Sequence, residues 1–171
     1  MDYLRFLEGT EKEDKGRYVT DILKYGSIRL ELVHNYVQRM FPTNEQSKFS
    51  NIRPITDEDI ALLRASDTAK ENISKMYQKM LVFWKIDGDR YKKWGFGAPF
   101  RLWNNWNNHN HWRMTRVIKC FMLLGMEEEH KDFSMRLSTI LEIKKSNPLS
   151  VRITKKTEEI WRRKFWETLN N

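Results

Sequence analysis

The apolar residues of this chain recur at steps of three and four positions, which places them on one face of an α-helix. The clearest case begins at Ser66 or Asp67 and runs to about Ile86. Its apolar positions are Ala69, Ile73, Met76, Met80, Phe83 and Trp84. A second case runs from Ser27 to Pro42, with Ile28, Leu32, Val33, Tyr36, Val37 and Met40 on its apolar side. No segment alternates apolar and polar residues as a half-buried strand does, so the pattern predicts an all-α fold.

Local signals mark the ends of further helices. Thr56, followed by three acidic residues, is an N-terminal signal, and Asn108 can cap a helix that Gly125 closes. The acidic run 127–129 suits the positive end of a helix dipole, and Pro148 ends that helix. Short helices are expected at 3–8, 17–24 and 100–106, and a basic C-terminal helix at about 154–169. We expect a single-domain compact helical bundle of about seven to eight helices over 1–171.

The composition supports a folded domain. Of the 171 residues, 40% are hydrophobic and 13% aromatic, which supplies enough apolar side chain to offset the entropy of an ordered chain. The chain has no internal repeat and no linker rich in Pro, Gly or Ser, which favours one domain. The formal net charge of +8 favours nucleic acid, anionic lipid or an acidic protein as partner. Many small basic proteins bind none of these, so the charge alone does not select among them.

Targeting signals and cysteine usage bear on the compartment. Cys120 is the single cysteine, so no intrachain disulfide can form, which fits a reducing compartment. The first eight residues lack the apolar core of a signal peptide, and the apolar run 121–124 is too short to cross a bilayer. We therefore expect a cytoplasmic protein, or a nuclear one if the host is a eukaryote.

The sequence contains no signature of catalysis. P-loop, dinucleotide-binding, nucleophile-elbow, zinc-protease and kinase motifs are all missing from it. His109 and His111 are two positions apart, a spacing that suits neither one helix face nor a closed zinc set. We expect no catalytic residues, no cofactor and no metal.

Two segments of the sequence carry a family resemblance. The first is Arg-Tyr-Val-Thr-Asp-Ile-Leu at 17–23, leading to Val-His-Asn-Tyr-Val-Gln-Arg-Met-Phe-Pro at 33–42. The second is His-Asn-His-Trp-Arg-Met-Thr-Arg-Val-Ile-Lys at 109–119, ending in Leu-Gly at 124–125. Pro-Ile-Thr at 54–56 fits the same order. Together they resemble the conserved region of the opioid growth factor receptor family over roughly residues 3–141. Arg39 departs from the family pattern, in which Trp is expected, and this sequence stops soon after the matched region, where vertebrate receptors carry long tails.

The resemblance implies a binding role. The family is named for binding an enkephalin-type opioid peptide in vertebrates, with a nuclear or perinuclear location, and neither matched segment is a catalytic signature. It therefore implies a non-catalytic binding module with a peptide or protein partner. A short stand-alone copy need not bind the same peptide.

The helix after Asn108 is the candidate partner-binding surface. Arg113, Arg116 and Lys119 recur at single-turn intervals, so they are expected on one face, where Arg forks suit phosphate or carboxylate. Trp112 and His34, both in the matched segments, complete the expected partner-binding set. The alternative is a solvated face, or buried arginines that tie the helix to backbone carbonyls.

Nucleic-acid binding is the alternative function, as in bacterial or phage DNA transactions. Lys92, Lys93 and Trp94 lie in a basic and aromatic loop, and Arg162 and Arg163 lie on the C-terminal helix. Rings beside cations can stack bases and hold phosphates. The same rings could be core residues, and the basic helix could be a solvated face, because cations complement the negative end of its dipole.

Overall fold

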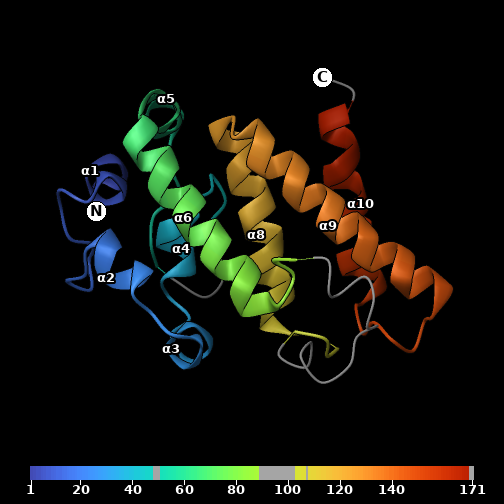
Figure 1. The fold of residues 1–171 in the computed structure, drawn as a ribbon. Helices are drawn as coiled ribbons and strands as arrows, with labels where there is room; N and C mark the ends of the chain where they lie inside the picture. Colours follow the sequence, from blue (N-terminus) through green and yellow to red (C-terminus); the bar gives the residue numbers. More distant parts are fainter. Residues whose placement is uncertain (48–50, 89–102, 107, 170–171) are drawn as a thin grey trace. The chain divides into compact units, whose positions relative to one another are not determined.

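The computed structural model describes residues 1–47, 51–88, 103–106 and 108–169, with side chains as far as residue 163. Over these residues the chain forms nine helices and no strand, so the all-α prediction is confirmed. In chain order they are α1 (Tyr3–Glu8), α2 (Val19–Leu23), α3 (Ser27–Leu32), α4 (Val37–Met40), α5 (Asp57–Ala65), α6 (Asp67–Trp84), α8 (His109–Leu124), α9 (Glu127–Ser146) and α10 (Lys155–Leu169) (Figure 1). The helix predicted at 100–106 falls largely outside the described residues.

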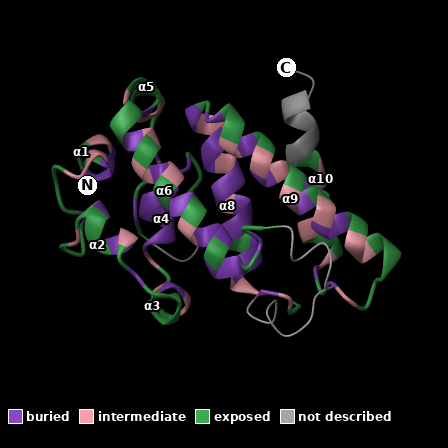
Figure 2. Ribbon diagram, in the orientation of Figure 1, coloured by how far each residue is buried: buried purple, intermediate pink, exposed green. Residues whose placement is uncertain are grey.

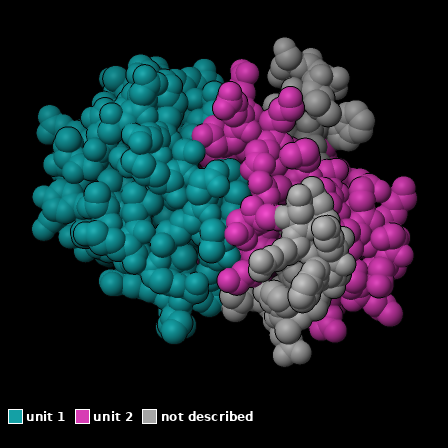
Figure 3. All heavy atoms as spheres, viewed as in Figure 1, with its two compact units in different colours: residues 1–83, 123–126 teal, residues 84–122, 127–171 magenta. Residues whose placement is uncertain are grey.

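The contacts divide the chain into two compact units, coloured separately in Figure 3. The first comprises Met1–Phe83 with Leu123–Met126, and the second comprises Trp84–Met122 with Glu127–Asn171. The prediction of a single domain stays a prediction. None of the described helices is both long and apolar enough to cross a membrane.

The first unit has a core of aromatic and branched side chains. In α6 the predicted stripe is buried at every position, and Ile73, Met76 and Met80 have no exposed surface. Helix α1 packs against α2 and α5, and the Asn72 side chain on α6 donates a 2.8 Å hydrogen bond to the Leu7 carbonyl of α1. Regular helical spacing of apolar residues therefore predicted most of the buried face of α6, which also includes Tyr77 and Leu81.

The second unit is organised around three buried tryptophans, each of which has a hydrogen-bonded indole. Trp103 donates to the backbone carbonyl of Trp84 at 2.9 Å, and Trp84 donates to the Asn110 side chain at 3.2 Å. Trp161 of α10 donates to the Thr115 hydroxyl of α8 at 3.0 Å. A buried indole N–H without a partner would cost free energy, so these bonds let large rings fill the core at no polar penalty.

Three predicted helix ends are confirmed. Thr56 caps α5, and its N–H donates a 2.9 Å hydrogen bond to the Asp59 carboxylate, which completes a capping box. The Asn108 side chain accepts from the Asn110 N–H at 2.8 Å at the start of α8. Gly125 has φ +65°, the left-handed conformation that ends a helix without steric cost.

The predicted helix at 27–41 is wrong. It divides into α3 and α4, because Val33 is extended (φ −88°, ψ 112°) and ends α3. Gly26, not Ser27, is the N-cap of α3. The predicted apolar face also differs, since Ile28 is 78% exposed and Leu32 69% exposed, whereas Leu30 is buried. Figure 2 shows exposed residues along α3.

Candidate binding surface

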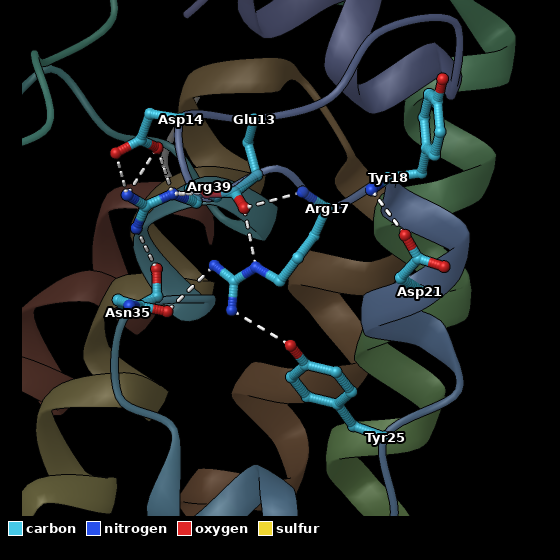
Figure 4. A network of polar contacts seen from close by, with 8 residues as sticks. All are labelled: Glu13, Asp14, Arg17, Tyr18, Asp21, Tyr25, Asn35 and Arg39. Carbon is cyan, nitrogen blue, oxygen red and sulfur yellow. Dashed lines mark hydrogen bonds and ion pairs between the residues drawn. The ribbon is translucent and has the colours of Figure 1, made fainter.

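A buried ion-pair network lies where α3 gives way to α4 (Figure 4). Arg39 on α4 forms an ion pair with Glu13 and a two-pronged contact with Asp14, with nitrogen-to-oxygen distances of 2.7 and 2.6 Å. Arg39 also donates to the Asn35 carbonyl. Arg17 donates to Glu13 at 2.7 Å and to the Asn35 side chain at 3.0 Å. Both guanidinium groups therefore converge on Asn35 and on the acidic loop before α2.

The network explains why the chain turns between α3 and α4. Asn35 accepts bonds from Arg17 through its side chain and from Arg39 through its backbone, so its groups are used for these contacts. Burial opposes charge on Asp14, but hydrogen bonds and charge from Arg39 hold its pKa below its usual value. The 2% exposure of Arg39 shows that this departure from the family pattern is part of the core. Arg17, Asn35 and Arg39 all lie in the matched segments, but nothing in the sequence predicted their contacts with one another or with the acidic loop.

The exposed side of α8 is a narrow stripe. Trp112 is 53% exposed, and Arg116 and Lys119, one and two turns further along, are half-buried on the same side. Cys120, next in sequence, is buried, and burial raises the pKa of its thiol to about 12. We name Trp112, Arg116 and Lys119 the α8 stripe. It combines a large ring with two cations.

Arg113 lies on the other side of α8. Its side chain is buried at 6% exposure and donates to the Asn110 side chain at 3.1 Å. The same amide oxygen accepts from Trp84, so Arg113 contributes to the tryptophan core. The expected common face of Arg113, Arg116 and Lys119 is therefore divided by burial, because Arg113 lies about 100° around the helix from Trp112, whereas Arg116 and Lys119 lie within about 40° of it.

His111 is enclosed by the same core. Its ring meets Trp103 and Trp161 edge-on at centroid distances of 6.3 and 6.1 Å. Burial lowers its pKa to about 4, while the Trp103 backbone opposes the shift. Within the described part of the chain neither ring nitrogen completes a hydrogen bond, and no group of three or more His, Cys, Asp or Glu could hold a metal ion. His111 is thus a neutral core side chain at physiological pH.

The other predicted site residues are dispersed. His34 is exposed in the segment after α3. Arg162 on α10 donates to Glu158 at 3.0 and 3.1 Å, and Arg163 is exposed. Lys92, Lys93 and Trp94 lie outside the described residues. Of the four predicted partner-binding residues on α8, Trp112, Arg116 and Lys119 share one side of the helix and Arg113 does not.

The family model for the opioid growth factor receptor (OGFr) conserved region matches residues 8–147 of the chain. The chain is also similar to the human opioid growth factor receptor, with 29% identity over 66% of this chain, and to the rat receptor, with 28% identity over 67%. The aligned part spans 18% and 21% of those receptors, about a fifth of their length. No solved structure matches the chain.

Proposed function

Because the chain belongs to the family defined by the opioid growth factor receptor conserved region, we propose that it is a non-catalytic module that binds a peptide or protein partner. The observation that carries the proposal is the α8 stripe, in which a half-exposed Trp112 lies beside Arg116 and Lys119. Tryptophan and arginine are the side chains most enriched among the residues that dominate binding energy at protein interfaces. The similar mammalian proteins are named as receptors, which fits a binding role.

The contrast among the tryptophans supports the choice of surface. Trp84, Trp103 and Trp161 are fully buried and use their indole N–H groups inside the second unit. Trp112 presents about half of its surface to solvent. A large ring in that position loses apolar surface to water on binding, at about 25 cal/mol per Å² covered. The cations beside it favour carboxylates or phosphates on the partner.

The absence of catalysis is part of the proposal. The buried Cys120 thiol, with its pKa of about 12, is a poor nucleophile, and His111 is enclosed by rings that separate it from substrates. We further propose a cytoplasmic or nuclear compartment, supported by the single cysteine of the sequence, Cys120, which fits a reducing compartment.

Affinity capture from cells that carry the gene tests the proposed surface. The tagged chain is compared with Trp112→Ala and with Arg116→Glu/Lys119→Glu, after nuclease treatment of every lysate. Lys145→Glu, an exposed position on α9, is the matched charge-reversal control. Partners that depend on the stripe should be lost from both stripe variants and kept by the control. Identical protein profiles for all four chains would reject the α8 stripe.

Nucleic-acid binding is the second candidate, favoured by the exposed cations Lys155, Lys156 and Arg163 on α10 and by the net charge of +8. Glu158 neutralises part of this helix, because it pairs with both Lys144 and Arg162. Binding through phosphates predicts an affinity that falls steeply as salt rises. A gel-shift titration at two salt concentrations measures it, and the absence of any shift at low salt removes this candidate.

A further inference from the structure

An open groove lies in the first unit, where the segment from the end of α2 into α3 meets the C-terminal half of α6. Its volume is about 530 Å³, within the range of sites that accept a ligand side chain or a small ligand. The lining residues are Leu23, Tyr25, Gly26, Ser27, Leu30, Lys75, Gln78, Lys79, Val82 and Phe83. It differs from the α8 stripe in every residue.

The chemistry of the groove is apolar with a basic border. Leu30 and Phe83 are buried, whereas Val82 on the same wall is 51% exposed. Lysines 75 and 79 are the only charged residues in the lining, which contains no acid. Lys75 pairs with Glu71 at 2.9 Å, while in the described part of the chain Lys79 forms no ion pair.

Two exposed apolar side chains of α3 lie on the face opposite to Leu30, which lines the groove. Ile28 and Leu32, one turn apart, are 78% and 69% exposed. Arg29 lies between them in sequence, and its guanidinium is 4.2 Å from the centre of the Tyr25 ring, so a cation also borders the groove.

We infer that this groove binds a short acidic segment of another protein, which inserts a large apolar side chain between α3 and α6. The carboxylates of the segment would lie against Lys79 and Lys75. Charge complementarity selects this occupant, because the lining carries cations without acids. A second copy of the chain is disfavoured, because two molecules of net charge +8 repel each other.

Gly26 offers a clean way to close the groove. It lines the groove as the N-cap of α3 with φ −77°, a conformation open to any residue, and a Cβ added there would meet nothing within 4 Å. Gly26→Trp should therefore fill the groove without disturbing the fold. Gly26→Ser is the matched control, because serine is a favoured N-cap residue and is too small to block the groove.

The probe is a fluorescein-labelled synthetic peptide of about twelve residues, with one Phe and one Leu among aspartates and glutamates. Fluorescence polarisation measures its binding to the full chain at physiological ionic strength. Two further peptides complete the set: one has Ser in place of Phe and Leu, and the other has Asn and Gln in place of the acids. Circular dichroism of each protein variant verifies folding.

We expect saturable binding of the acidic apolar peptide, weakened at least about tenfold by Gly26→Trp and by Lys79→Glu. Gly26→Ser, Lys145→Glu and Arg116→Glu/Lys119→Glu should bind it as the unchanged chain does, and both altered peptides should bind more weakly. No saturable binding up to about 1 mM peptide would overturn the inference. Equal binding of the serine peptide, or a loss confined to the α8-stripe variant, would also overturn it. That last result would support the proposed surface on α8, so the two ideas fail separately.

Discussion

The ion-pair network around Arg39 makes the sharpest stability prediction. Arg39→Met keeps most of the side-chain volume but removes the charge that faces Glu13, whose own side chain has 0% exposure. Removing one partner of a buried ion pair costs about 3–5 kcal/mol, because the other charge stays buried. Arg17 would still bond Glu13 at 2.7 Å, and Asp14 is 44% exposed and can be hydrated. We therefore expect the lower end, about 3 kcal/mol.

Urea denaturation followed by far-ultraviolet circular dichroism measures this cost. Arg53→Met is the matched control, because Arg53 also pairs with an aspartate but its side chain is 46% exposed. An exposed pair contributes little, so the control should cost less than about 1 kcal/mol. Equal losses for the two arginine variants would refute the assignment of a buried charge pair.

Two predictions concern pH. The hydrogen bond from Arg53 lowers the pKa of Asp59 from 3.8 to about 2. Its stabilisation is therefore complete above about pH 4 and lost as the pH falls towards 2, and after discounting for exposure it amounts to about 1 kcal/mol. Acid titration of unfolding should show Asp59→Asn less stable than the unchanged chain at neutral pH and equal to it near pH 2. Burial lowers the pKa of His111 from 6.5 to about 4, so this residue affects stability between those two pH values. Its unfolded form gains a proton first, so stability should fall by up to about 3 kcal/mol as the pH drops from 6.5 to 4. His111→Gln should flatten that part of the curve, and an unchanged slope would count against the enclosed ring.

Helices whose burial follows one regular stripe were predictable. On α6, spacing predicted a stripe that is buried at every position, because a long helix that packs along its length hides every third or fourth residue, but it missed the buried Tyr77 and Leu81. The caps of α5 and α8 were also predictable, because a cap depends on residues a few positions apart. All the residues that form such a stripe or cap lie close together in the sequence, so the sequence alone is enough to predict it.

The segment 27–41 contains a helix break that local sequence signals did not predict. Its apolar spacing resembles one helix, yet Arg17 and Arg39 reach Asn35 from 18 and 4 positions away. Contacts between residues far apart in the sequence leave no periodic pattern of apolar positions. They can nevertheless override the helix propensity of a single residue. The exposure of Ile28 and Leu32 follows from the same break, because α3 no longer continues the face of α4.

The candidate surface was predictable in part. Sequence spacing predicted that Arg113 shares a face with Arg116 and Lys119. In the structure Arg113 is buried in the tryptophan core, where it donates a hydrogen bond to the side-chain amide of Asn110. Which of two neighbouring positions faces solvent depends on the partners of the helix, which its own sequence does not contain. The groove beside α3 had no sequence signal, because its lining comes from segments about fifty residues apart.

The enclosed Cys120 has a practical consequence for spectroscopy. It is the sole cysteine of the chain and is fully buried with a thiol pKa of about 12, so alkylating reagents reach it only when the surrounding helices open. Its labelling rate in native buffer would therefore report the frequency of such openings. A second cysteine placed at Ile28 or Trp112 would react at once, which allows a spin or dye label to be attached selectively while the natural thiol remains in place.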